Sequence, residues 1–262
     1  MPSDDSPEVR TEIEPLGEAG RLARVTVHNP ARLNVLDSGL TRQLITAFRT
    51  LGGERELRCV VLTGSGSRAF IGGADIREMA ELDHETTHPF ISRLHLACQA
   101  IRRLQVPVIA RIRGYCLGAG VEVAASCDLR VASEDATFGM PEVKVGIPSV
   151  IEAALLPRLI GSGRARELVY TGEPITAAEA ERWGLVERVV PDGELDAATR
   201  RWVDAIAAAG PGAIRLQKAL AQRWDTLPLD HAIQVGIRSF TTAYHTDEPQ
   251  RYMQAFLDRK RQ

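Results

Sequence analysis

The feature that most constrains this sequence is the alternation of short β-type runs with amphipathic helical stretches, from about residue 12 to residue 195. Parallel strands need long crossover connections, which are usually helices, so the alternation predicts an α/β fold. The strand candidates are short runs rich in apolar and β-branched residues, at positions 24–28, 59–63, 107–112 and 129–132.

Apolar residues at helical spacing predict two helices between these strands. The first has Asp37 or Ser38 as an N-cap, and its apolar face contains Leu40, Leu44, Phe48 and Leu51. The second presents Phe90, Leu94, Ala97, Ile101 and Leu104 on one face.

The chain divides into three predicted parts. Residues 1–11 are expected to form a disordered tail, residues 12–195 the α/β core, and residues 196–262 a helical C-terminal region. Four helical stretches account for the end of the chain, at 194–209, 211–226, 229–245 and 247–260. Because these stretches have little core of their own, we expect them to pack on the main domain or on a partner subunit.

Charge and hydropathy narrow the classes of partner. The 262 residues carry a formal net charge of -2, which gives no overall attraction to nucleic acid. No apolar run reaches the roughly 20 residues that span a bilayer. The acidic start MPSDDSPEVR also lacks the features of a secretory or mitochondrial leader, so we expect a cytoplasmic protein without membrane partners.

The cysteines provide no sign of a disulfide framework or a metal cage. They lie inside apolar segments and form no CxxC pair, so we expect small buried hydrophobic residues at Cys59, Cys98, Cys116 and Cys127.

One motif, HExxH at His84–His88, matches a zinc-protease signature. Zinc binding needs both histidines on one face of a stable helix and a third ligand beyond them. Pro89 disfavours helical backbone at His88, and Ile91 and Leu94 occupy the positions that the extended motif needs. We therefore interpret the motif as a polar loop that opens a helix, and we expect no metal.

A second motif, GxGxxA at Gly64–Ala69, matches a dinucleotide-binding pattern. Such a turn must lead directly into a helix. This one continues into FIGG at residues 70–73, so we interpret it as an ordinary turn.

Two glycine-rich segments are stronger candidates for a catalytic site. The first reads IGGADIREM at residues 71–79, and the second reads GYCLGAGVE at residues 114–122. Each places small residues where a strand or loop gives way to a helix, and a helix start has unpaired N–H groups at its positive end. Two such amides directed at one carbonyl oxygen form an oxyanion hole.

Two glutamates accompany these segments. Glu122 lies three residues after Ala119 on the same helical face, and Glu142 follows Gly139 and Pro141 at the end of a strand. Carboxyl groups that share an apolar site have their pKa values pushed apart, so one can act as acid and the other as base. Spacing alone does not establish the pair, because the chain has 34 acidic residues.

With two later stretches, these segments resemble the enoyl-CoA hydratase/isomerase (crotonase) family. The similar blocks read GGADIREM, GYCLGAGVEVAASCDLRVAS, FGMPEVKVGIP and TGEPITAAEAERWGLVERVV. The resemblance covers the chain from about Val25 to Arg259. It implies a crotonase-like spiral of repeated ββα units, a helical C-terminal trimerisation region, and a homotrimer or dimer of trimers.

Carried over position by position, the resemblance implies a site for an acyl-CoA thioester, in which coenzyme A is part of the substrate and no separate cofactor is needed. The N–H groups of Ala74 and Ala119 would form the oxyanion hole. Glu122 would deprotonate the attacking water and Glu142 would protonate the substrate, although the division of roles is open. The implied substrate- and CoA-binding residues are Arg32, Leu33, Gly72, Asp75, Ile76, Met79, Ile147, Phe256 and Arg259; ordinary core packing explains Met79 and Ile147 equally well.

The chain departs from the family at residues 147–156. Many members have a glycine-rich segment like IPGAGGTQRL there, whereas this chain reads IPSVIEAALL. Ser149 and Glu152 have the spacing of a capping box, so we interpret Glu152 as structural, with a third catalytic carboxylate as the alternative. The departure bears on acyl preference more than on the chemistry.

The leading hypothesis is hydration of a 2-trans-enoyl-CoA to the 3-hydroxyacyl-CoA. An isomerase that moves an enoyl-CoA double bond is the nearest alternative, because one glutamate would suffice for it. A non-catalytic CoA-ester- or RNA-binding protein of the same fold is an alternative of another class, which both acids and the near-neutral charge disfavour. The physiological acyl group, the pathway, and trimer against hexamer remain open.

Overall fold

Two β-sheets form the centre of the protein in a computed structural model that describes residues 6–259. The larger sheet contains, in spatial order, β1 (Glu8–Pro15), β2 (Arg21–His28), β3 (Leu57–Gly64), β5 (Val108–Ile112), β7 (Leu129–Ser133) and β10 (Arg188–Val190). The smaller sheet contains β4 (Ala69–Ile71), β6 (Tyr115–Leu117), β8 (Thr137–Gly139) and β9 (Ile175–Thr176). All four predicted strands are confirmed, in β2, β3, β5 and β7, with β5 beginning one residue later than predicted.

The chain winds through both sheets in repeated units. Strands β3 and β4 lead to α2 (Ile76–Ala80) and α3 (His84–Arg103), and β5 and β6 lead to α4 (Ala119–Ser126). In the third unit, β7 and β8 lead to the 3₁₀ helix η2 (Pro141–Val145). Each unit gives one strand to each sheet, parallel to the strand of the unit before. The predicted α/β spiral of ββα units is confirmed.

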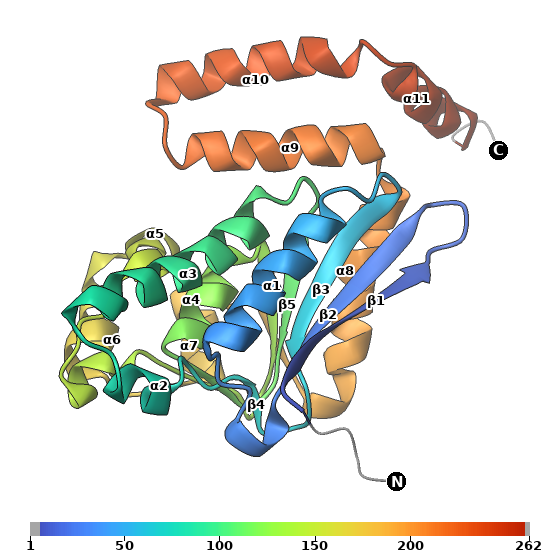
Figure 1. The fold of residues 1–262 in the computed structure, drawn as a ribbon. Coiled ribbons are helices and arrows are strands. Elements are labelled where there is room, and N and C mark those ends of the chain that lie inside the picture. The colour runs from blue at the N-terminus through green and yellow to red at the C-terminus, as the bar shows by residue number, and fades with distance from the viewer. Residues whose placement is uncertain (1–5, 260–262) are drawn as a thin grey trace, which may run out of the picture.

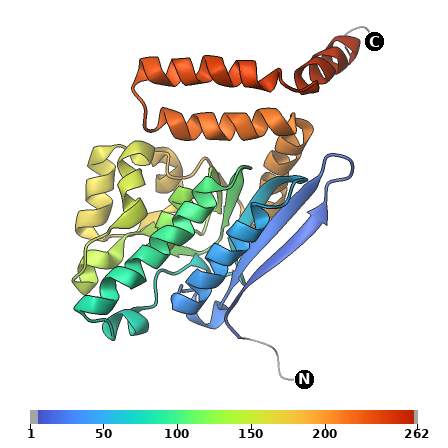
Figure 2. The ribbon, with the colours of Figure 1, turned by 45° about the horizontal axis from the view of Figure 1, so that its top comes forward.

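Helices cover both faces of the larger sheet, as expected for parallel strands (Figures 1 and 2). On one face, α1 (Ser38–Leu51) and α3 bury the apolar sides predicted from their spacing. On the other face, Leu195, Ala198 and Val203 of α8 (Leu195–Ala208) pack on the sheet. The four cysteines are buried and unpaired within the described residues.

Shorter helices complete the core. They are η1 (Pro30–Arg32), η3 (Ile151–Leu155), α5 (Leu156–Ile160), α6 (Ser162–Thr171), α7 (Ala177–Trp183) and η4 (Asp192–Glu194).

The predicted disordered tail is wrong for residues 8–11, which belong to β1. This strand pairs antiparallel with β2 over its whole length, from Glu8 opposite His28 to Pro15 opposite Arg21. Its side chains are mostly exposed, so the sequence EVRTEIEP lacks a pronounced apolar alternation, and backbone hydrogen bonds to β2 define the strand instead. Residues 1–5 of the predicted tail lie outside the described part of the chain.

The predicted polar loop at residues 84–88 is also wrong, because α3 begins at His84. Asp83 accepts hydrogen bonds from the amides of Glu85 and Thr86, and the Thr86 hydroxyl accepts one from the Asp83 amide. This capping box stabilises the first turn by about 1 kcal/mol, which offsets the weak helix propensity of the threonines. His84 and His88 are exposed on that helix.

The four predicted C-terminal helices are confirmed as α8, α9 (Pro211–Trp224), α10 (Leu229–Ala243) and α11 (Glu248–Arg259). Helices α9 and α10 lie against each other at one end of the molecule, and α11 extends beyond them (Figure 1). None of the helices within residues 6–259 is long and apolar enough to cross a membrane.

Long polar side chains join this C-terminal region to the core. Arg58 on β3 donates to the carbonyl oxygens of Ile206 and Ala209, at 3.1 and 2.5 Å. Lys218 on α9 is buried, and its Nζ lies 2.9 Å from the Val106 carbonyl oxygen and 2.7 Å from Oδ2 of Asp128. We call these contacts the polar seam.

Lys218→Ala tests the contribution of the polar seam to stability. The substitution removes the donor to the Val106 carbonyl and the cation beside Asp128, which keeps only the Val108 amide as a donor. A hydrogen bond to a charged group contributes about 1.5–3 kcal/mol. We expect the free energy of unfolding in urea to fall by about 2 kcal/mol. The exposed Arg201→Ala on α8 is the control, with a change within about 0.5 kcal/mol. Equal losses in the two variants would contradict the role of Lys218.

Candidate active site

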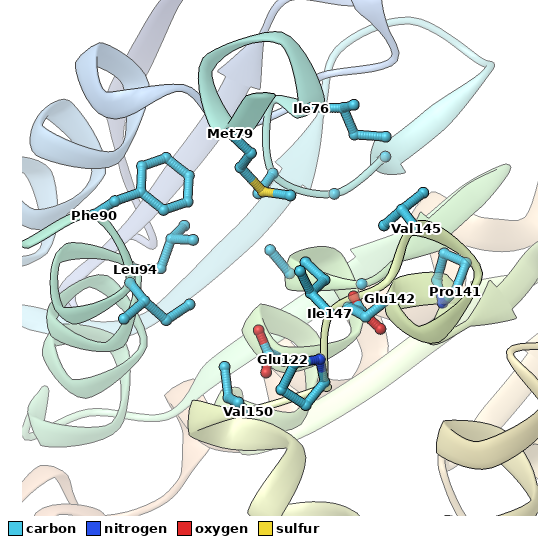
Figure 3. Close-up of a pocket in the computed structure, with 17 residues that line it drawn as sticks. Ile76, Met79, Phe90, Leu94, Glu122, Pro141, Glu142, Val145, Ile147 and Val150 are labelled. Carbon is cyan, nitrogen blue, oxygen red and sulfur yellow. The ribbon is translucent and has the colours of Figure 1, made fainter. Parts of the chain in front are cut away.

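One cavity lies where the start of α4, the loop before α2, and η2 meet the apolar face of α3 (Figure 3). Glu122 and Glu142 both line it, and Figure 3 shows their carboxyl groups facing a common space. They are the only ionisable side chains among the described residues that line the cavity. The remaining lining residues are Gly72, Gly73, Ala74, Ile76, Met79, Phe90, Ile91, Leu94, Gly118, Ala119, Pro141, Val145, Ile147, Pro148 and Val150.

Glu122 lies in the first turn of α4 and is only 5% exposed. Its Oε1 accepts a hydrogen bond of 3.2 Å from the Ala153 amide. Burial raises the pKa of Glu122 to about 9 against the opposing effect of that amide, and the nearby Glu142 and Glu152 add to the rise. Glu122 therefore keeps its proton at neutral pH in the free protein.

Glu142 lies in η2 and is held from two sides. The Ser149 hydroxyl donates a 2.7 Å hydrogen bond to its Oε2. Its Oε1 lies against the main chain of Gly118, where an added Cβ would lie only 2.3 Å away. Gly118 also has a φ of +51°, which residues other than glycine rarely adopt. Both the backbone conformation and the space beside Glu142 therefore require glycine at this position.

Two main-chain amides in the cavity wall have no acceptor. Ala119 is the first residue of α4, so its N–H has no partner within the helix. Ala74 lies in the loop before α2, where the flanking Gly73 carbonyl and Asp75 amide bond to Leu36. Within residues 6–259, neither the Ala74 amide nor the Ala119 amide donates a hydrogen bond. A carbonyl oxygen in the cavity can accept from such amides.

Comparisons with known proteins identify the family of the chain. The sequence profile described as enoyl-CoA hydratase/isomerase matches residues 17–262. The chain is 34% identical over 247 residues to a short-chain-enoyl-CoA hydratase of Clostridium acetobutylicum, covering 94% of this chain and 95% of the relative. It is 33% identical over 242 residues to a crotonyl-CoA hydratase of Syntrophomonas wolfei, covering 92% and 93%. The chain belongs to the enoyl-CoA hydratase/isomerase (crotonase) family.

Solved structures agree with the family assignment. The enoyl-CoA hydratase of Mycobacterium smegmatis superimposes with a TM-score of 0.92 at 32% identity, over 97% of each chain. That of Bacillus anthracis gives a TM-score of 0.90 at 32% identity, over 95% of this chain and 96% of the other. The two sheets and the C-terminal helices described above are thus the crotonase fold.

The other residues implied by the family resemblance fall into two groups near the cavity. Gly72, Ile76, Met79 and Ile147 line it directly. Arg32, Leu33 and Asp75 do not line the cavity. They contact the loop that carries Ala74 from the side away from the cavity.

Asp75 is the N-cap of α2 and accepts from the Arg77 amide and from Arg32, at 2.9 and 2.6 Å. Burial opposes ionisation of Asp75, but the Arg32 guanidinium and the amide hold its pKa below the usual value. The Leu33 carbonyl accepts from the Gly72 amide at 2.8 Å. These bonds fix the loop on both sides of Ala74.

Phe256 and Arg259 do not join the cavity within this chain. Both lie on α11, at the far end of the C-terminal region, and neither lines the cavity (Figure 1). The Arg259 Nε donates to the Ala255 carbonyl of its own helix.

The capping box predicted at Ser149 and Glu152 is wrong. Val150, not Ser149, is the N-cap residue of η3, and no side chain caps this helix. Ser149 binds Glu142 instead, and Glu152 binds His95 on α3. Neither partner lies within the capping pattern, and His95 is 57 residues away from Glu152, so the local pattern could not indicate them.

The sequence also gave no sign of several cavity walls. Phe90, Ile91 and Leu94 line the cavity, although helical spacing predicted only a core-facing side for α3. An apolar face has the same sequence pattern whether it meets packed atoms or an open pocket. Within residues 6–259, no group of three or more His, Cys, Asp or Glu side chains is placed to hold a metal.

The raised pKa of Glu122 predicts a pH-dependent loss of stability. The unfolded chain ionises this group above about 4.5, whereas the folded chain keeps its proton up to about 9. Stability therefore falls as pH rises between these values, and Glu122→Gln abolishes the effect. We expect the variant to exceed the wild type by more than about 1 kcal/mol in urea unfolding at pH 8.

The pH series provides the control for this prediction. Near pH 4.5 the two proteins should have similar stabilities, and the advantage of the variant should grow toward pH 9. The exposed Glu167→Gln on α6 should leave the pH dependence unchanged. An advantage of Glu122→Gln that is the same at every pH would contradict the retained proton.

Proposed function

We propose that this protein is an enoyl-CoA hydratase, which adds water reversibly to a 2-trans-enoyl-CoA. The observation that carries the proposal is one cavity that presents two carboxyl groups and two unbonded amides between apolar walls. The names of the relatives support an acyl-CoA thioester as the substrate, with coenzyme A as part of it. No separate cofactor enters the reaction.

The amides of Ala74 and Ala119 are proposed to bind the thioester oxygen. Hydrogen bonds from both would polarise the conjugated double bond and stabilise the negative charge that reaches this oxygen as water attacks Cβ. The positive end of α4 adds to that stabilisation. Removing one donor of such a site in other enzymes lowers the rate by about 10²–10³.

Glu122 and Glu142 are proposed to share one proton and to bind the same water. One carboxylate takes a proton from the water as its oxygen bonds to Cβ, and the other carboxyl group gives a proton to Cα, so the pair holds one proton before and after. Because burial holds that proton on Glu122 in the free protein, Glu122 acts as the base only after the proton has passed to Glu142. The bound water between them provides the route.

The CoA portion is proposed to leave the cavity past the loop before α2. Ile76 lines the cavity and is 59% exposed, which suits contact with the pantetheine chain at the mouth. Arg32 is partly exposed beside Asp75 and brings positive charge toward the side where CoA phosphates would lie. Gly72 and Leu33 would contribute main-chain contacts there, and Met79 and Ile147 would contact the acyl group.

The role of each glutamate is tested by its substitution with glutamine. The assay mixes purified protein with a short 2-enoyl-CoA and follows the loss of the conjugated-thioester absorbance. We expect the wild type to hydrate the substrate. Glu122→Gln and Glu142→Gln should each lose at least about 10²-fold in kcat, the scale of general acid–base catalysis. Glu167→Gln, which is exposed and does not line the cavity, should keep full activity.

Other outcomes would favour the alternatives. Wild-type protein that shifts a 3-enoyl double bond but does not hydrate would be an isomerase. Protein that does neither, and binds RNA with an affinity that falls steeply with salt, would belong to the non-catalytic class.

A homotrimer is proposed from the exposed apolar side of α10. Leu229, Ile233, Ile237, Phe240 and Tyr244 follow one another at helical spacing, and Phe240 is 67% exposed. We call these five residues the α10 stripe. An apolar stripe of this kind normally packs against another surface. In such an assembly, α11 of one copy could carry Phe256 and Arg259 toward the cavity of a neighbour.

Phe240→Asp tests the α10 stripe. Light scattering after size exclusion should give three chains, or a multiple of three, for the wild type. The buried carboxylate in the variant should dissociate it toward monomers, since an unpaired charge is costly to bury. Gln234→Asp places the same charge on the same helix outside the stripe and should leave the assembly intact. A monomeric wild type would refute the trimer.

A further inference from the structure

The segment of residues 149–153 touches both glutamates of the cavity. The Ser149 hydroxyl donates to Oε2 of Glu142 at 2.7 Å, and four residues later the Ala153 amide donates to Oε1 of Glu122 at 3.2 Å. The two ends of one five-residue segment therefore contact the carboxyl groups of Glu142 on η2 and Glu122 on α4. The relative position of the two carboxyl groups depends on the position of this segment.

The Ser149 contact limits how Glu142 can turn. A glutamate side chain has several rotamers, and those near the surface exchange rapidly. Here Oε2 is bound by the hydroxyl while Oε1 lies against Gly118, so both oxygens are in contact. One carboxylate orientation is thereby selected.

Glu152 fastens the same segment to α3. This side chain is only 3% exposed, and its two oxygens lie 2.9 and 3.2 Å from Nδ1 of His95. Because a carboxylate only accepts hydrogen bonds, Nδ1 of His95 donates. Arg102, about two turns further along α3, lies 4.0 Å from the same carboxylate. A buried charge with these partners resists displacement.

The backbone between the two contacts is strained. Ile151 has a φ of +40°, in the left-handed region that a β-branched residue strongly disfavours. Such a conformation is unfavourable and persists only where the surroundings enforce it, most often at functional sites. Ser149 on one side and Glu152 on the other provide that enforcement.

We propose that Ser149 and Glu152 are positioning residues, which hold segment 149–153 so that its hydroxyl and its Ala153 amide fix Glu142 and Glu122 around one water. This inference rests on the proposed hydration reaction for its kinetic consequences, but its structural claim is independent of the reaction. Neither residue needs to touch the substrate.

Ser149→Ala and Ser149→Thr test the hydroxyl. Loss of one hydrogen bond corresponds to about a tenfold change, so we expect Ser149→Ala to lower kcat about tenfold with KM changed less than about twofold. Ser149→Thr retains a hydroxyl and should recover most of kcat. Thr199→Ala, which removes a buried hydroxyl from α8 far from the cavity, should leave kcat unchanged. Wild-type kcat in Ser149→Ala would overturn the proposal.

His95→Ala tests the contact between Glu152 and α3. It does so without replacing a buried charge, because His95 is partly exposed. We expect kcat to fall several-fold while KM is retained, since the Ala153 amide is then free to shift from Glu122. Ser92→Ala, also on α3 and without contact to Glu152, is the matched control. Unchanged kcat in His95→Ala would remove Glu152 from the proposal.

Crystal structures of wild type and Ser149→Ala give a readout that needs no activity. We expect one Glu142 rotamer in the wild type and more than one in the variant. If the wild type does not hydrate an enoyl-CoA, the proposed function fails, while the rotamers still decide the positioning role. A single unchanged Glu142 rotamer in Ser149→Ala would refute that role.

Discussion

The site depends on keeping polar groups buried without full partners. An unsatisfied buried hydrogen-bond donor costs about 1–3 kcal/mol, so the amides of Ala74 and Ala119 stay free only where the surrounding backbone cannot move to satisfy them. The spiral provides that rigidity, because β4 and β6 are parallel neighbours and the segments after them leave from the same edge of the smaller sheet. The two amides therefore lie in the wall of one cavity, although they are 45 positions apart in the sequence.

Much of this architecture could be predicted from local patterns. The strands at 59–63 and 107–112 and the helices of the C-terminal region follow from apolar runs and helical spacing, because almost every side chain in the central strands is buried. Strand β1 escaped prediction because hydrogen bonds to β2, and not burial, define it. The start of α3 differs from the prediction because the cap at Asp83 offsets the weak helix propensity of two threonines and a proline.

The candidate site was only partly accessible to the same reasoning. Spacing could not pair Glu122 with Glu142, and the resemblance to a family provided that pair. Ser149 and Glu152 matched a local capping pattern, but their side chains bind Glu142 and His95 outside that pattern, and those partners are known only once the chain is folded. Phe256 and Arg259 illustrate a further limit, since they match family positions at the end of the chain but lie on α11 and do not line the cavity of this chain.

The polar seam has a consequence for how this protein responds to dilution. Arg58 and Lys218 add directional bonds to the apolar packing of α8, whereas α10 packs mainly against α9. If copies assemble through α10, most of the burial that orders the last two helices comes from other chains. Their order then follows mass action, so the same polypeptide would be better folded at its C-terminus in a concentrated solution than in a dilute one.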